Sequence, residues 1–127
     1  MLTGNGKGKS SSGFGTVIRT LGHGYKAGLV QFIKGTWDCG EAKILATLPG
    51  LTHEVMGSGF TWETQNKESD TAAAQVTWQE AKRMLKDESI NLVMLDEITY
   101  MITYGYIDLD EVLEAISSRP AMQSVII

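Results

Sequence analysis

The chain has 127 residues, of which 43% are hydrophobic and 20% are charged, so there is room for one globular domain with one core. A formal net charge of −4 argues against a general nucleic-acid binder, and a single cysteine, Cys39, excludes an internal disulfide framework and fits a reducing compartment. No apolar run approaches the roughly 20 residues of a membrane span, and no signal-peptide pattern precedes the first glycines. We therefore expect a cytoplasmic protein without membrane contact.

Strand-like and helix-like segments alternate along the first half of the chain. A glycine-rich turn at residues 3–8 opens into a helix predicted over 9–21, and Gly22, His23 and Gly24 end that helix. His23, between two glycines, is expected to be a turn residue. A buried strand over 27–33, a short helix over 40–48 and a strand over 51–56 follow.

The second half continues the same alternation. Residues 70–86 give the clearest helical pattern, with one apolar stripe that is expected to be buried and consists of Ala74, Trp78, Ala81 and Leu85. A short apolar run at 92–95 is typical of a strand buried on both faces. A helix is predicted over 108–117 with Asp108 as its N-cap, and a last strand over 124–127. Such alternation implies a parallel sheet covered by helices.

The sharpest local pattern is TGNGKGKS at residues 3–10. It matches the end of the phosphate-loop pattern Gly-x₄-Gly-Lys-Ser/Thr, although Thr3 stands where the first glycine normally lies. The glycines let backbone N–H groups converge on phosphate oxygens, and the positive end of the following helix faces the same anions. Lys9 adds a full charge, and the hydroxyl of Ser10 can bind Mg²⁺. The alternative is a flexible glycine-rich terminus that binds nothing.

A second pattern supports the first. The strand predicted at 92–95 is followed by Asp96 and Glu97, which is the arrangement that delivers a carboxylate to a metal ion at the end of a buried strand. The loop and the acidic strand together predict a nucleoside triphosphate site, but they do not identify a reaction.

Longer blocks are more specific. TGNGKGKS, FGTVIRTLGHG, VQFIKGTW, GSGFTWETQN and LDEITYMITYGYIDLDEV closely resemble the P-loop type of bacterial corrinoid adenosyltransferase, from residue 3 to 127. The resemblance implies transfer of the 5′-deoxyadenosyl group of ATP to Co(I) of cobalamin or a precursor corrinoid, with release of triphosphate, in adenosylcobalamin synthesis and salvage. Two alternatives stay open: a P-loop kinase or ATPase, and a non-catalytic ATP- or corrinoid-binding fragment.

The resemblance also implies the site residues. ATP is expected to contact Gly4, Asn5, Gly6, Lys7, Gly8, Lys9, Ser10, Ser11 and Arg19. Lys9 and Ser10 are the expected catalytic residues, and Mg²⁺, or Mn²⁺ in its place, is expected at Ser10 and Glu97 with Asp96 as a second acid. Arg19 reads equally well as a solvated helix charge.

Aromatic residues are expected on the corrinoid side. By resemblance, Phe60 and Trp62 pack against the corrinoid as an apolar wedge that excludes the lower axial ligand of cobalt and so favours its reduction to Co(I). Their alternative role is to anchor their own loop in the core. Tyr100, Met101 and Tyr104 belong either to the core or to the pocket. The implied partners are a flavoprotein electron donor such as flavodoxin and a second copy of the chain in a homodimer.

The expected fold is a three-layer α/β P-loop NTPase domain of RecA-like type with a mainly parallel sheet, and residues 1–127 form one nucleotide-binding domain. In this fold the phosphate loop follows a central strand, whereas only Met1 and Leu2 precede Thr3. We therefore expect a chain that is truncated at both ends, with two open strand edges beside the missing strand and with weak stability or a tendency to oligomerise.

Overall fold

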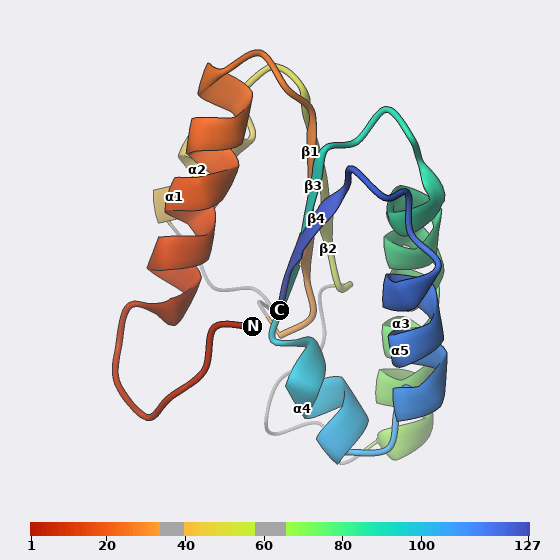
Figure 1. The fold of residues 1–127 in the computed structure, drawn as a ribbon. Coiled ribbons are helices and arrows are strands. Elements are labelled where there is room, and N and C mark those ends of the chain that lie inside the picture. The colour runs from red at the N-terminus through yellow and green to blue at the C-terminus, as the bar shows by residue number, and fades with distance from the viewer. Residues whose placement is uncertain (34–39, 58–65) are drawn as a thin grey trace.

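The computed structural model describes residues 1–33, 40–57 and 66–127, and within them four parallel strands form one sheet in the order β2-β1-β3-β4 (Figure 1). The elements are α1 (Lys9–Gly22), β1 (Ala27–Gln31), α2 (Gly40–Leu45), β2 (Leu51–Val55), α3 (Lys67–Lys86), β3 (Leu92–Asp96), α4 (Ile98–Thr103), α5 (Leu109–Ser117) and β4 (Ser124–Ile126). The predicted α/β class with a parallel sheet is confirmed.

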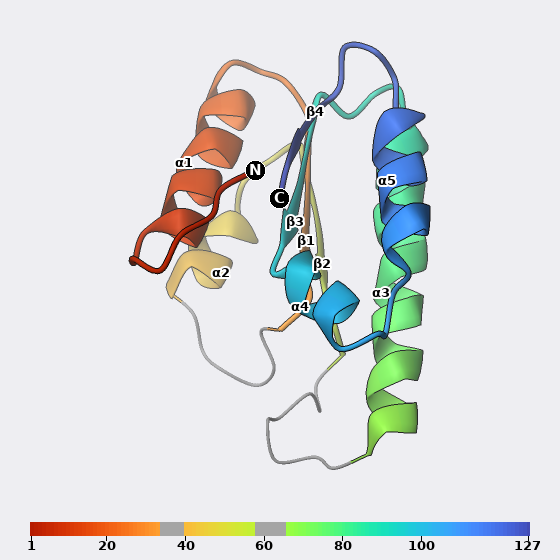
Figure 2. The same ribbon diagram turned by 60° about the horizontal axis from the view of Figure 1, so that its bottom comes forward.

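The sheet is the middle of three layers. Helices α1 and α2 cover one face, and α3 and α5 lie side by side on the other (Figures 1 and 2). β1 and β3 are buried at every position, because strands flank them on both sides and helices cover both faces. This explains why their sequences are apolar runs rather than alternating patterns.

Alternate side chains of the strands enter two separate cores. Leu29 of β1 and Met94 of β3 pack with Phe14 and Val17 of α1. Their neighbours in sequence point the other way, toward a larger core beneath α3 and α5 that contains Val30, Val93, Leu95, Trp78 and Leu85. The predicted apolar stripe of α3 is confirmed, since Trp78 and its partners on that stripe are buried.

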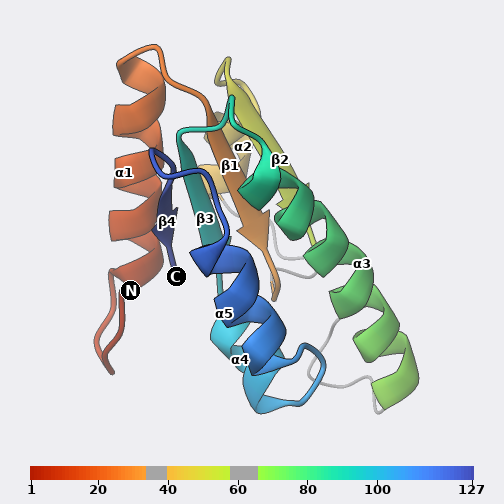
Figure 3. The same cartoon turned by 45° about the vertical axis from the view of Figure 1, so that its right-hand side comes forward.

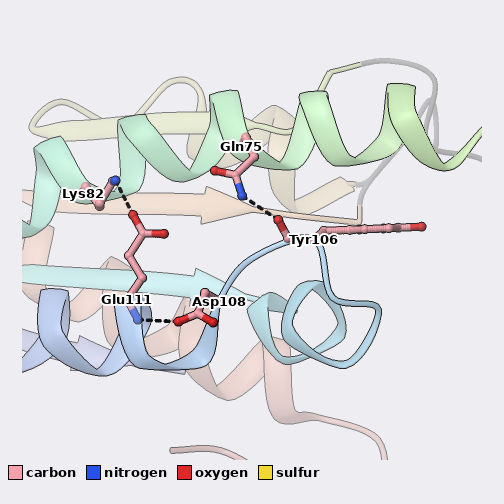
Figure 4. A network of polar contacts seen from close by, with 5 residues as sticks. All are labelled: Gln75, Lys82, Tyr106, Asp108 and Glu111. Atoms are coloured by element: carbon pink, nitrogen blue, oxygen red, sulfur yellow. Dashed lines mark hydrogen bonds and ion pairs between the residues drawn. The ribbon is translucent and has the colours of Figure 1, made fainter.

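Polar contacts join α3 to α5 and to the segment that precedes α5 (Figure 4). Lys82 pairs with Glu111, and this hydrogen bond lowers the pKa of the Glu111 carboxyl. The Nε2 group of Gln75 donates to the carbonyl oxygen of Tyr106 at 2.6 Å. The predicted N-cap of α5 is confirmed, because Asp108 accepts from the backbone N–H of Glu111.

Most predicted elements are confirmed with shifted ends. α3 begins three residues before the predicted start, because the side chain of Asn66 caps it by accepting from Ser69 N–H at 3.2 Å. α2 ends at Leu45, short of the predicted residue 48, and the chain continues in turns. α4 was not predicted. Its sequence ITYMIT is rich in β-branched residues, and it is held by the buried side chains of Ile98 and Met101.

The expectation of two open strand edges beside a missing central strand is wrong for the described residues. β1 and β3 are the central strands and pair directly with each other. The segment that leads into the glycine loop lies next to β4 instead, where Leu2 N–H donates to the carbonyl oxygen of Ile127 at 2.7 Å. Figure 3 shows the two chain ends close together at this side of the sheet.

The sheet and the glycine loop are arranged so that the loop, the carboxyl end of β3 and α4 share one end of the molecule (Figures 1 and 3). In parallel α/β sheets this end is where ligands bind.

Among the described helices, none combines the length and the apolar character required to cross a bilayer.

One close approach positions α1 on the sheet. A Cβ atom on Gly13 would lie 2.4 Å from the Cε atom and 2.8 Å from the sulfur of Met94. Gly13 therefore allows the first turns of α1 to lie close to β3. Gly15, two residues later on the same helix, is exposed and has no atom within 4 Å of the corresponding position.

The two glycines give a matched test. We expect Gly13→Ala to be less stable than Gly15→Ala by about 1 kcal/mol, because its methyl group must displace the end of the buried Met94 side chain. Gly15→Ala should raise the free energy of unfolding by about 0.5–1 kcal/mol, as alanine does in an open helix position. Urea unfolding of both variants measures the difference. Equal stabilisation by both substitutions would contradict the packing described above.

Candidate functional site

A pocket of about 420 Å³ opens at the carboxyl end of β3 and β4. Its lining combines the N-terminal segment and glycine loop, the first turn of α1, the end of β3 and the start of α4, and includes Gly4, Asn5, Lys9, Ser10, Asp96, Glu97 and Tyr100. The predicted loop and acidic strand, which are separated by more than 80 residues in the sequence, therefore meet at one cavity.

The backbone of the loop needs its glycines. Gly4 has φ of 135° and Gly8 has φ of 100°, which are conformations that other residues rarely adopt. Gly8 is the N-cap residue of α1 and has no side chain to occupy the first N–H groups of the helix. The positive end of a 14-residue helix consequently faces the loop.

Lys9 and Ser10 begin α1 and point in different directions. The Nζ atom of Lys9 donates to the carbonyl oxygen of Gly6 at 2.6 Å, so the ammonium group lies over the loop. The hydroxyl of Ser10 donates to Oδ1 of Asp96 at 2.9 Å. This second contact joins the loop directly to the end of β3.

Asp96 links Ser10 to a chain of side-chain hydrogen bonds. Its other oxygen, Oδ2, accepts from Nε2 of Gln31 at 3.3 Å, and Oε1 of Gln31 lies 2.8 Å from Nε2 of His53. Only 6% of Asp96 and 3% of Gln31 is exposed. The sequence analysis missed Gln31 and His53. A polar residue within the apolar run AGLVQFI was the available signal, because a buried amide requires hydrogen-bond partners.

Glu97 follows with a left-handed backbone, φ 67°, at the N-cap position of α4. This conformation is unfavourable by roughly 1–2 kcal/mol for residues other than glycine, and such strain is concentrated at functional sites. Glu97 is partly buried and lines the pocket beside Asp96. The structure thus brings both predicted acids to the cavity and puts Asp96, rather than Glu97, in contact with Ser10.

The donor set fits a hard divalent cation. Within residues 1–33, 40–57 and 66–127 no group of three or more His, Cys, Asp and Glu residues could hold a metal ion by itself. Ser10, Asp96 and Glu97 nevertheless line the same pocket, and the hydroxyl of Ser10 contacts the Asp96 carboxylate. Mg²⁺ commonly uses one or two carboxylates and completes its shell with phosphate oxygens and water, so these residues suit a metal bound together with a nucleotide.

Other predicted site residues divide into three groups. Gly6, Lys7 and Gly8 are exposed parts of the loop, and Ser11 faces a separate groove between α1 and α2. Arg19 is exposed in the last turn of α1, ten residues or about 15 Å along the helix from Lys9, so the structure does not bring it to the pocket. Phe60 and Trp62 lie outside the described residues.

The structure distinguishes residues for which the sequence left open a place in the core or in the pocket. Tyr100 lines the pocket, whereas Met101 is fully buried in the core beneath α3 and α5. Tyr104 is half-buried, with its ring centroid 6.0 Å from that of Tyr100. His23 is the C-cap residue of α1, which confirms its interpretation as a turn residue.

The chain matches the family model described as ATP:corrinoid adenosyltransferase BtuR/CobO/CobP over residues 1–127. It is 56% identical over 127 residues to the corrinoid adenosyltransferase of Escherichia coli (strain K12) and 54% identical to corrinoid adenosyltransferase CobA of Salmonella typhimurium (strain LT2). Both alignments cover 100% of this chain and 64% of the relative. The enzyme of Pseudomonas aeruginosa is 50% identical over 126 residues. The chain thus spans slightly less than two thirds of the length of these relatives.

The strain at Glu97 can be measured by comparing alanine with glycine. Because glycine tolerates a positive φ, we expect Glu97→Gly to be more stable than Glu97→Ala by about 1 kcal/mol in urea unfolding. The control is Glu114, an exposed residue inside α5, where the order should reverse and alanine should be the more stable by about the same amount. The same order at both positions would contradict the left-handed conformation.

His53 gives a pH prediction. Burial lowers the pKa of His53 below the ordinary value near 6.5. The imidazole therefore binds a proton more tightly in the unfolded chain than in the folded one. The free energy of unfolding should therefore fall as the pH drops from 7.5 to 5.5, and the fall should be smaller in His53→Gln. Urea titrations at both pH values measure the difference, with Thr52→Val on the same strand as the control. An unchanged pH dependence in His53→Gln would contradict the prediction.

Proposed function

Because this chain belongs to the ATP:corrinoid adenosyltransferase family BtuR/CobO/CobP, we propose that it transfers the 5′-deoxyadenosyl group of ATP to the Co(I) centre of a corrinoid and releases triphosphate. The names of relatives that are 50–56% identical support this assignment. The observation that carries the proposal is the 2.9 Å contact between Ser10 and Asp96, which unites an open glycine loop and an acidic strand end at one pocket.

The residues of this chain would act by holding and stabilising the polyphosphate. The N–H groups at the start of α1 and the ammonium of Lys9 provide fixed positive charge over the loop. Negative charge grows on the triphosphate as it leaves the ribose carbon, and preorganised donors stabilise that charge. The nucleophile is the reduced cobalt of the substrate, so no general base is required. Positioning the 5′ carbon for in-line attack is the other contribution of the protein.

We propose Ser10, Asp96 and Glu97 as the residues that hold Mg²⁺, with Mn²⁺ as a substitute. When bound, the ion would neutralise charge on the triphosphate and link it to the end of β3. The hydroxyl of Ser10 and both carboxylates belong to the same pocket lining, which supports this set over one that uses Glu97 alone.

The corrinoid side of the site rests mainly on the family resemblance. Tyr100 contributes an aromatic surface to the pocket lining, and Phe60 and Trp62 stay the predicted wedge against the corrinoid. Binding of ATP through Arg19, a homodimer, a flavoprotein electron donor and a cytoplasmic location likewise stay predictions.

The product distinguishes the proposal from its alternatives. With chemically reduced cobalamin and MgATP, we expect a light-sensitive adenosylated corrinoid and one intact triphosphate per turnover. ADP or AMP as the main product would favour a kinase or ATPase instead. Binding of both substrates without turnover would support the non-catalytic fragment.

Lys9→Ala tests the role of the loop. The variant lacks the positive charge that would stabilise the leaving triphosphate, and kcat should fall by about 10²–10³-fold. The matched control is Lys86→Ala, which removes an exposed lysine at the far end of α3 and should leave the rate unchanged. Equal rates in both variants would contradict the proposed stabilisation by Lys9.

A further inference from the structure

We propose that Gln31 and His53 are positioning residues that hold the carboxylate of Asp96 in a fixed orientation for a divalent cation. The inference deepens the proposed function and rests on it, because it assumes a metal-dependent nucleotide site at the pocket. It assigns a role to two residues, on β1 and β2, that lie outside the pocket lining.

The sheet register brings the three side chains to one face. Gln31 pairs with Asp96 across the β1–β3 ladder, and His53 pairs with Leu29, two residues before Gln31. Side chains two residues apart on a strand share a face, so all three lie on the side covered by α1. The same face carries the apolar layer of Leu29 and Met94. Asp96 and Gln31 are the last residues of β3 and β1, whereas His53 lies in the middle of β2, so the polar chain runs across the sheet beside this packed core.

Hydrogen-bond chemistry fixes the direction of the chain. An ionised carboxylate only accepts, so Gln31 must donate to Asp96 with its amide nitrogen, and its oxygen then faces His53. His53 must consequently donate from Nε2. The pKa of His53 is lowered by burial, which is compatible with a neutral imidazole that carries its proton on this nitrogen. The donor and acceptor of each hydrogen bond are thus fixed. A flip of the Gln31 amide, which exchanges its oxygen and nitrogen, would break both hydrogen bonds.

The two oxygens of Asp96 are thereby distinguished. Oδ2 is tied to the buried amide of Gln31, while Oδ1 accepts from Ser10 at the edge of the pocket. A cation that binds the oxygen of Ser10 requires its hydroxyl proton to turn away from Oδ1. That oxygen then becomes free to act as a ligand without rotation of the carboxylate. Such outer hydrogen bonds typically change metal affinity by about 10–100-fold.

A purely structural role makes a different prediction. If Gln31 and His53 only satisfy each other within the sheet, their loss should reduce stability and leave metal affinity unchanged. The experiment therefore compares variants that differ in hydrogen bonding but are similar in size. Gln31→Met and His53→Leu remove the donors, while His53→Gln keeps an amide N–H that can reach Oε1 of Gln31. Thr52→Val changes an exposed position on the same strand.

Two binding constants are measured for each variant of the 127-residue chain: that of ATP without metal, and that of Mn²⁺ for the ATP-bound protein by electron paramagnetic resonance. We expect Gln31→Met to weaken Mn²⁺ binding by about tenfold or more and His53→Leu by a smaller factor. His53→Gln should restore most of the affinity, and Thr52→Val should match the wild type. Binding of ATP without metal should stay unchanged throughout, and urea unfolding confirms that each variant is folded.

The outcomes separate the two levels of inference. If the wild type binds ATP and Mn²⁺ and all variants bind Mn²⁺ equally well, the positioning role is wrong and the proposed function stands. If His53→Gln is as weak as His53→Leu, the hydrogen bond is not the cause. A parallel loss of metal-free ATP binding would indicate a general disturbance of the loop. If the wild type binds no ATP at all, the proposed function itself fails.

Discussion

The contact between Ser10 and Asp96 is the constraint on which the site depends. It joins the first turn of α1 to the end of a central strand, and so converts two separate sequence patterns into one pocket. It requires α1 to lie close to β3, which Gly13 allows by leaving room for Met94. It also requires the polar end of β3 to project toward α1 rather than toward α3. β3 thus determines both the packing of α1 on the sheet and the position of the acidic residue in the pocket.

The two faces of the sheet differ in the side chains that they bury. The side covered by α3 and α5 contains the larger core, to which the strands contribute apolar side chains such as Val30, Val93 and Leu95. The side covered by α1 has a smaller core and the polar chain from Ser10 to His53. Burial of these polar groups is tolerated because each has a hydrogen-bond partner. The packed core next to these side chains restricts the conformations that they can adopt.

The order of elements and the meeting of loop and acidic strand could be predicted from the sequence, because both depend on strong local signals: glycine runs, apolar periodicity and acids after an apolar strand. α4 could not, since ITYMIT has weak helix propensity and is held by the core contacts of Met101. The partnership of Gln31 and His53 depends on strand register, which the sequence does not specify directly. The same holds for the position of the N-terminal segment beside β4.

β3 also limits how the length of this protein can vary. Its even-numbered side chains, including Met94 and Asp96, serve one face, and its odd-numbered ones, including Val93 and Leu95, serve the other. Inserting or deleting a single residue in this strand would exchange the two sets. The carboxylate would then point into the apolar core beneath α3 and α5, and a valine would point toward α1. Gain or loss of residues is therefore better tolerated in the connections between elements, where no alternation of side chains has to be kept.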